Sequence, residues 1–488
     1  MNHSSSRMRL LTSEDLRSLH HASLAILSDP GMRIDASPLR DALGRAGAGV
    51  DEARHLVRFP SDLIEATIEG LQQGIRAGSP QLVLNGVVAS LTKPAMAVKF
   101  GGACIEVYDL DSRSTRPPRR QDLVNLVRLG EALPEVGTVG NPVIYLVEDD
   151  GTLVDPRLQR VKTAALIARY TRKAGPTEVW NGKELKYLME LGEIVRGGHQ
   201  AYLANPCFVT AKETIAPLIL DEAAGEVLLL LAENGLPCTL IPMPVSGASS
   251  PLTIASNIAL GNAEILGVFC ALRAACPTAN CVGGIISGIL DMRSGAAVFG
   301  APESVLQDLG LAELHERLYG FDFGVGGYVD SKEPGEQIAI EVTGRFALLA
   351  QSGRFNVPVG LLNGGKRFSA EQALVDIEIE RWILESLKSI DVTSETLRVD
   401  QIRKVGIGGN SLSEEHTLEV MRKNVWYPSL MDRTLSASDQ SDRARDMLSN
   451  ANRKVREILS RSDLYEADAG QCRAIDAVVR AAERDLAG

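Results

Sequence analysis

Histidine and aromatic residues are scarce in this chain. Its 488 residues include seven histidines and three tryptophans, and Phe, Trp and Tyr together make up 5%. No expected strand ends in a histidine; the seven lie at positions 3, 20, 21, 55, 199, 315 and 416. A serine nucleophile or a water-activating base then lacks its usual partner, which argues against acyl transfer and hydrolysis. No Asp/His/Glu cluster has metal-ligand spacing, so we predict no metal site.

A basic excess and a long apolar run are also missing. The formal net charge is -11, whereas a nucleic-acid partner requires a basic stripe. No apolar run approaches the roughly 20 residues that cross a bilayer. The segment Met1–Arg9 lacks the apolar core of a signal peptide. We therefore expect a cytoplasmic protein with neither a nucleic acid nor a membrane as partner.

Cysteine is present but unpatterned. The seven cysteines are at positions 104, 207, 238, 270, 276, 281 and 472, mostly in apolar surroundings. Their odd number favours reduced thiols in a reducing compartment. Cys276 and Cys281 form the one close pair, with no histidine nearby, and buried thiols explain them better than a zinc site.

Short apolar runs alternate with amphipathic helical stretches from Pro94 to Asn363. Eight runs are expected strands: Ala97–Gly101, Thr138–Val143, Thr177–Asn181, Asn205–Val209, Pro237–Met243, Asn280–Ile285, Phe321–Gly327 and Val357–Leu362. Helical crossovers return the chain to the same end of a sheet, so parallel pairing is expected. Eight such units over roughly 270 residues predict an α/β fold of the (β/α)8 TIM-barrel type, with a doubly wound open sheet as the alternative.

We expect helical additions to this barrel at both ends of the chain. We predict an N-terminal helical region over residues 1–93, the barrel over 94–366 and a C-terminal helical region over 367–488. Ala373–Ile390 and Ser441–Arg461 are long amphipathic stretches of the last region. No repeat or low-complexity linker interrupts the chain, which favours one catalytic unit.

The carboxyl ends of parallel barrel strands form the active-site face. In this chain those ends are rich in glycine and aromatic residues and poor in acids and histidine. Glycines let a large partner approach the backbone, although tight turns explain them equally well. The stretch Phe323–Tyr328 contains Gly-x-Gly-Gly. Without a following basic residue this motif is only a weak indication of phosphate binding. It leaves a lyase that acts on a phosphate-bearing ligand as one alternative function.

A series of short motifs in fixed order gives a more specific indication. They include Leu11–Leu16, Lys99–Gly102, Pro242–Pro251, Asp291–Gly295, Gly300–Glu303, Asp330–Lys332, Gly360–Gly365 and Trp426–Pro428. In this order the chain resembles the trimethylamine:corrinoid methyltransferase family along nearly its whole length. The resemblance implies a (β/α)8 enzyme that moves a methyl group from an amine to Co(I) of a separate corrinoid protein.

One position departs from the archaeal members of that family. Where they insert pyrrolysine, immediately before Gly360, this chain has Val359. Relatives without pyrrolysine include glycine betaine methyltransferases. A quaternary ammonium already carries a neutral amine as leaving group, so orientation and desolvation suffice. We therefore expect a quaternary amine, glycine betaine or a close relative, as methyl donor.

Candidate site residues follow from the donor's chemistry. Aromatic faces and an acid hold a trimethylammonium group, and a carboxylate requires Arg, Asn or backbone N–H groups. The candidate aromatic residues are Phe100, Trp180, Phe208, Phe299 and Tyr328, with Glu106 or Glu213 as charge partner. The candidates for the carboxylate are Arg293, Asn181 and Asn363, and Gly326, Gly327 and Gly364 are expected to face the corrinoid. Packing in the core, or an ion pair in the case of Arg293, is the simpler explanation for several of them.

The cobalamin is expected on a partner protein. The chain contains no Asp-x-His, and therefore no Asp-x-His-x-x-Gly corrinoid signature. We expect the glycine-rich face to dock that partner, no tightly bound cofactor in this chain, and a homo-oligomer. Two alternatives remain at this point: a barrel that binds quaternary amines without catalysis, and a related methyltransferase with a different acceptor.

Overall fold

Two parallel ladders form the centre of the fold. The computed structural model describes residues 7–76, 97–354, 356–433 and 446–487. One ladder has the order β16 (Asn356–Pro358), β4 (Ala97–Phe100), β7 (Val136–Val139). The other has the order β15 (Phe323–Val325), β12 (Asn280–Ile285), β10 (Pro237–Leu240), β8 (Ala211–Lys212). All five pairings are parallel.

Backbone hydrogen bonds connect the two ladders through short extended segments. The Val139 N–H donates to the carbonyl of Lys173, and the Thr177 N–H donates to the carbonyl of Val209. Val139 and Ala174 also form a parallel bridge. Neighbouring segments in the sheet are therefore neighbours in the chain: 97–100, 136–139, 173–177, 207–212, 237–240, 280–285 and 323–325.

This arrangement confirms the predicted mixed α/β class. No ladder joins β15 to β16 within the described residues, so closure into a barrel stays a prediction. The two strands nevertheless come close: a Cβ at Gly327 would lie 2.7 Å from Pro358 Cδ. Beyond them, Gly364 N–H donates to the carbonyl of Val329.

Two expected strands were wrong in position. No strand lies at Thr177–Asn181, because the pairing falls on 173–177 and the Asn181 side chain accepts from Lys183 N–H and Glu184 N–H to begin a helix. Nor does a strand occupy Asn205–Val209; the regular strand there is β8, at Ala211–Lys212. Pro176 and Pro206 have no N–H to donate, so the ladder is irregular where they occur.

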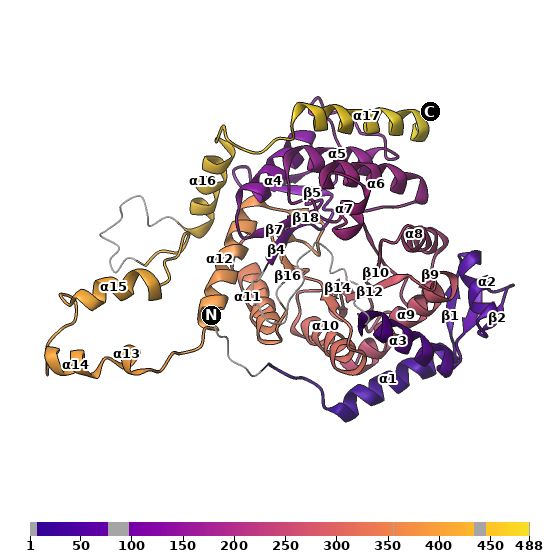
Figure 1. Cartoon of the computed structure of the whole chain (residues 1–488), viewed down its shortest axis with the longest axis horizontal. Helices are drawn as coiled ribbons and strands as arrows, with labels where there is room; N and C mark the ends of the chain where they lie inside the picture. Colours follow the sequence, from indigo (N-terminus) through magenta and orange to yellow (C-terminus); the bar gives the residue numbers. More distant parts are fainter. Residues whose placement is uncertain (1–6, 77–96, 355, 434–445, 488) are drawn as a thin grey trace.

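Helices surround the central strands (Figure 1). They are α4 (Arg120–Ala132), α5 (Gln159–Tyr170), α6 (Gly182–Arg196), α7 (His199–Ala204), α8 (Glu222–Glu233), α9 (Ile254–Ala275), α10 (Pro302–Leu314), the π-helix η1 (His315–Tyr319), α11 (Glu336–Gln351) and α12 (Ala370–Ser386). Short strands after the central ones form two small sheets: β17 (Leu361–Leu362), β18 (Arg367–Phe368), β5 (Glu106–Asp109) and β6 (Ser114–Arg116) in one, and β11 (Val245–Ser246), β13 (Gly288–Asp291) and β14 (Ala296–Val298) in the other.

Helix α9, with 22 residues, is the longest of the described helices. It is the one described helix whose length and composition would allow it to cross a membrane. All sixteen residues from Asn257 to Leu272 are buried in the fold, where the helix packs against α1, α2 and α10. Its apolar surface is therefore matched by protein, as expected for a core helix.

The N-terminal region combines helices with a small sheet. Helices α1 (Ser13–Ser28), α2 (Ser37–Arg45) and α3 (Ser61–Arg76) flank strands β1 (Met32–Ile34), β2 (Gly49–Asp51) and β3 (Leu56–Arg58). Strand β9 (Ile219–Leu220), from the middle of the chain, joins this sheet parallel to β1. A capping box between Thr12 and Asp15 begins α1.

The C-terminal region has two parts. Helix α16 (Met447–Leu459) packs on α12 and α4, and α17 (Ala469–Leu486) packs on α5 and α6. Between α12 and α16 the described residues form three shorter helices, α13 (Ser394–Leu397), α14 (Val399–Val405) and α15 (Glu415–Asn424). These helices extend away from the rest of the molecule (Figure 1). We refer to residues 388–428 as the arm and to the remaining described residues as the body. The domain boundaries expected at 93/94 and 366/367 stay a prediction.

Candidate functional site

A cavity of about 550 Å³ lies among the central strands. Seven of the eight expected strands contribute to its wall, through Phe100, Asn141, Thr177, Thr239, Gly283, Val325 and Val357. In place of the eighth, expected at Asn205–Val209, Ala211 of β8 lines the cavity. The volume lies within the range that proteins use for small-molecule and cofactor sites. The carboxyl ends of the strands reach it through Gly101, Gly102, Gly326 and Gly327, where backbone alone forms the wall.

Three neutral buried side-chain groups in the cavity wall have no hydrogen-bond partner among the described residues. They are the Asn141 amide nitrogen and the hydroxyls of Thr177 and Thr239. Each of these residues is at most 5% exposed. A buried polar group without a partner costs about 1–3 kcal/mol, so native proteins satisfy such groups with water or a ligand. The cavity wall is thus prepared for a polar occupant.

Four carboxylates and three basic side chains line the same cavity: Glu178, Glu213, Glu316, Asp322, Lys99, Arg273 and Arg354. Arg354 and Glu316 form an ion pair at 2.9 Å. Glu213 lines the cavity. Desolvation by the surrounding protein disfavours its charged form and raises its pKa to about 7. The positive charge of Lys212 lowers this pKa, and the negative charge of Glu178 raises it. Burial lowers the pKa of Lys99. The described residues provide no ion-pair partner for Lys99, and they contain no group of three potential metal ligands.

Strand pairing fixes Lys99 in place. Lys99 is opposite Pro358 in the parallel pair of β4 and β16. Its carbonyl accepts a hydrogen bond of 3.2 Å from Val359 N–H. The residue immediately before Gly360 is therefore joined through the backbone to the cavity lysine. Val359 itself is fully buried and does not line the cavity.

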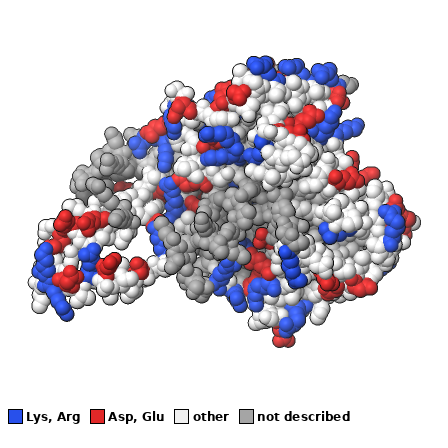
Figure 2. All heavy atoms as spheres, in the orientation of Figure 1, with Lys and Arg blue, Asp and Glu red and all other residues white. Residues whose placement is uncertain are grey.

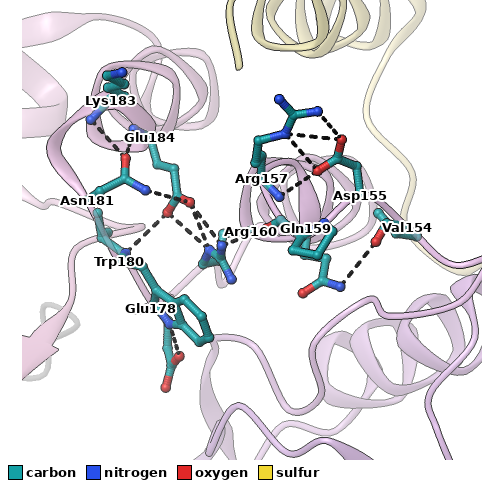
Figure 3. A network of polar contacts seen from close by, with 12 residues as sticks. Val154, Asp155, Arg157, Gln159, Arg160, Glu178, Trp180, Asn181, Lys183 and Glu184 are labelled. Atoms are coloured by element: carbon teal, nitrogen blue, oxygen red, sulfur yellow. Dashed lines mark hydrogen bonds and ion pairs between the residues drawn. The ribbon is translucent and has the colours of Figure 1, made fainter. Parts of the chain in front are cut away.

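Glu178 is positioned by a polar network at the edge of the cavity (Figure 3). The Trp180 indole N–H donates to Glu178 Oε2 at 2.9 Å. The Arg160 guanidinium lies over the indole ring, 4.1 Å from its centroid, and pairs with Glu184 at 3.0 Å. Asn181 caps α6 and also donates to Glu184. One face of Trp180 is therefore already occupied by an arginine of the same chain.

The structure brings five of the expected site residues to the cavity wall. They are Phe100, Glu213, Gly326, Gly327 and Tyr328. Burial raises the pKa of Tyr328, which keeps its hydroxyl neutral. The ring lies close to Gly365, where a Cβ would be 2.6 Å from Tyr328 Cε1 and where φ is +78°. Only glycine fits this approach and this backbone conformation.

The other expected residues lie outside the described cavity wall. Trp180 is 53% exposed and Arg293 is exposed in the turn between β13 and β14, whereas Phe208 is fully buried. Phe299 packs edge to face on Tyr328, with 6.0 Å between the ring centroids. Glu106 pairs with Arg367 at 2.8 Å, Asn181 caps α6, and the backbones of Asn363 and Gly364 donate to the carbonyls of Ser331 and Val329.

Sequence reasoning missed the polar wall of the cavity. Lys99, Thr177, Glu178 and Thr239 were not among the candidates, and Asn141 was noted only as a strand end. Because the third strand was expected at 177–181, its end was placed at Trp180–Asn181 and not at Thr177–Glu178. Pro176 was the one available signal that regular pairing ends there.

Comparison with solved structures places the fold among the methylamine methyltransferases. The crystal structure of the Methanosarcina barkeri monomethylamine methyltransferase (MtmB) aligns with a TM-score of 0.50 and 12% identity, covering 97% of this chain and 88% of that chain. At this identity the similarity establishes the fold alone.

Sequence comparison identifies the family. The chain belongs to the trimethylamine methyltransferase (MTTB) family, whose model matches residues 1–486. It is 29% identical over 451 residues to trimethylamine methyltransferase MttB of Desulfitobacterium hafniense DCB-2, covering 91% of this chain and 88% of the relative. It is 26% identical to MttB of Methanosarcina barkeri strain Fusaro (99% and 96% covered). A glycine betaine methyltransferase of D. hafniense Y51 is 25% identical (88% and 88% covered). The predicted family resemblance is thus confirmed.

Proposed function

We propose that this protein, a methyltransferase of the trimethylamine methyltransferase family, takes a methyl group from a small quaternary amine. Glycine betaine or a close relative is the donor, and Co(I) of a corrinoid on a separate cytoplasmic protein is the acceptor. The relative that acts on glycine betaine supports this choice of donor. In this proposal the eight strand units close into a (β/α)8 barrel around the cavity.

The observation that carries the proposal is the charge arrangement of the cavity. Glu178 and Glu213 provide negative charge for an ammonium group, and Lys99 provides positive charge without a partner among the described residues. The unpartnered Asn141 amide and Thr177 and Thr239 hydroxyls offer further hydrogen bonds. Such a cavity suits a zwitterion with a cationic and a carboxylate end. The Tyr328 ring adds aromatic surface for the methyl groups. The Phe100 ring is 1% exposed and packs on Phe368, with 5.3 Å between the ring centroids, so it lines the cavity through its backbone.

The chemistry requires little from acids and bases. The bond between nitrogen and the methyl carbon breaks, its electrons stay on nitrogen, and a neutral tertiary amine leaves. The corrinoid supplies the nucleophile when its protein is bound. The residues of this chain hold the donor in line and exclude water. No histidine is among the described residues of the cavity wall, which is compatible with this assignment.

In this proposal Gly326 and Gly327 face the corrinoid. They follow the carboxyl end of β15 and line the cavity without a side chain, so a large partner can approach their backbone. Gly364 lies beside Phe299: a Cβ at Gly364 would be 3.9 Å from Phe299 Cδ2. In this proposal Gly364 forms part of the same docking face. Val359, at the position of pyrrolysine, contributes only packing.

The first test is methyl transfer to free Co(I) cobalamin, followed by visible absorbance. Glycine betaine, proline betaine, carnitine, choline and trimethylamine are supplied in turn. We expect transfer from a carboxylate-bearing quaternary amine and none from trimethylamine. Calorimetric binding of a betaine without transfer to any acceptor, the cognate corrinoid protein included, would instead establish a non-catalytic binder.

A variant of the cavity lysine tests the charge arrangement. Lys99→Met keeps the length of the side chain and removes its charge. A charge-assisted hydrogen bond contributes about 1.5–3 kcal/mol, so betaine affinity should fall by roughly 10–100-fold. Choline, which has no carboxylate, should bind the variant as it binds the wild type. Equal losses for both ligands would contradict the assigned role of Lys99.

A further inference from the structure

The arm is a long excursion whose two ends lie on one helix. The chain leaves the body at the end of α12 and returns at Ser429 (Figure 1). There the buried Glu378 carboxylate of α12 accepts from the N–H groups of Ser429 and Leu430 at 2.8 and 2.9 Å, and from the Ser429 hydroxyl at 2.8 Å. Asn450 of α16 donates to the Leu430 carbonyl at 3.0 Å. The base of the arm is therefore firmly part of the body.

Between these anchors the arm buries nothing. Ile383 and Leu430 are buried, but none of the side chains described between them is. Helices α13 and α14 contain no buried residue at all. The three arm helices have four, seven and ten residues. Isolated helices below about 12–15 residues are marginal in water and depend on tertiary packing.

Large apolar side chains are concentrated on this segment. Of the 21 exposed large hydrophobic residues described, eleven lie in the arm: Ile390, Val392, Leu397, Val399, Ile402, Ile407, Leu412, Leu418, Met421, Val425 and Tyr427. Two more, Trp382 and Met431, lie at its base. Exposed apolar side chains concentrated in one segment are unusual on a monomeric soluble protein and are typical of an interaction site.

The apolar residues also form helical stripes. Leu418, Met421 and Val425 follow the spacing i, i+3, i+7 along α15 and its C-cap, and Val399 and Ile402 are three apart on α14. Such spacing places side chains on one face of a helix, as in helices that pack on protein. The stripe therefore has the pattern of a buried face, and the described residues provide no surface that covers it.

Charge indicates which partner covers the arm. Residues 388–428 contain six basic and six acidic residues and are electrically balanced, whereas the whole chain has a net charge of -11. Figure 2 shows both signs interspersed along the arm. A balanced arm can lie against a second, acidic copy of the chain without the repulsion that two acidic bodies would suffer.

We propose that the arm packs on a second copy of this chain and holds a homo-oligomer together by reciprocal exchange. A symmetric dimer brings each arm to the same surface of its partner. A stable interface needs about 800 Å² per partner, which is within reach of eleven exposed large apolar side chains. An apolar segment that is permanently exposed requires a permanent partner, and a second copy is always present.

The test measures the mass of the full-length protein by sedimentation velocity. The variant Leu418→Glu/Met421→Glu places two charges on the α15 stripe. Its matched control, Asn410→Glu/Ser413→Glu, adds the same charge at exposed polar positions of the arm. We expect the wild type and the control to sediment as a dimer or a larger symmetric oligomer, and the stripe variant to sediment as a monomer.

Two results would overturn the proposal. One is a wild-type protein that is monomeric at tens of micromolar; the other is a stripe variant that keeps the wild-type mass. Helical content and the binding of quaternary amines, measured on the same samples, confirm that the body stays folded. An arm that becomes covered only when the corrinoid protein is added, with the chain otherwise monomeric, would assign it to that partner and count against a second copy. The outcome is independent of which amine is the donor.

Discussion

The body and the arm place the same kinds of side chain in opposite environments. In the body, Arg345 and Asp308 form an ion pair at 3.0 Å, with both side chains at most 2% exposed. In the arm, Lys404 and Glu414 pair at 2.7 Å with the lysine 69% exposed. The apolar residues differ in the same way, since they form the core of the body and the surface of the arm. The body thus buries its apolar side chains within one chain, while the described residues leave those of the arm exposed.

The largest expected effect contrasts these two ion pairs. Arg345 also donates to the carbonyls of Gly326 and Phe299 at 2.8 and 2.6 Å, so it supports the cavity wall. Breaking a buried ion pair leaves an uncompensated charge and costs about 3–5 kcal/mol. We expect Arg345→Met to lower the free energy of unfolding by this amount in denaturant titrations. Lys404→Met, the same substitution in the arm, should leave it unchanged. Similar losses in both variants would remove the distinction between body and arm.

The second prediction concerns the charge of the cavity. Because the pKa of Glu213 is about 7, its carboxyl group loses its proton as the pH rises from about 6 to 8. The affinity for a quaternary amine should therefore rise over this interval, by roughly tenfold. Glu213→Gln should bind weakly with no such slope, as calorimetry at several pH values would show. The arm variant Leu418→Glu/Met421→Glu should keep the wild-type slope; a pH dependence that survives in Glu213→Gln would assign it to another group.

The smallest expected effect lies at the edge of the cavity. Trp180→Phe removes the indole N–H that donates to Glu178 and keeps an aromatic ring under Arg160. One hydrogen bond contributes about 0.5–1.5 kcal/mol, so amine affinity should fall roughly threefold. A loss of a hundredfold would show that the indole contacts the donor directly. Sedimentation of this variant should match the wild type, because Trp180 belongs to the body.

The sequence predicted the class of the fold and six of the seven strands described in its two central ladders. Strand–helix alternation is a local pattern, and short apolar runs such as Pro237–Leu240 and Asn280–Ile285 are evident without tertiary information. The strands near Pro176 and Pro206 were displaced by a few residues. Near these prolines, backbone pairing depends on residues that are distant in sequence. The end of the third strand was therefore expected about three residues too late, at Trp180–Asn181, whereas Thr177 and Glu178 are the residues that line the cavity.

The cavity and the arm show two limits of such reasoning. Lys99 lies within a strand, and nothing in its surroundings in the sequence indicates an enclosed ammonium group. The arm was expected to be helical, and its apolar stripes are typical of a buried face. A pattern of this kind predicts that a face is covered, but it does not identify the surface that covers it.

The volume of the cavity has a consequence for hydration. At about 30 Å³ per water molecule, 550 Å³ corresponds to roughly 18 waters. A betaine has eight non-hydrogen atoms and displaces only a minority of them. Under the proposed function, we therefore expect most of the water to leave only when the acceptor protein binds, and most of the change in heat capacity to accompany that step. The donor alone should bind with a small heat-capacity change, and the reacting methyl group should become dry only in the ternary assembly.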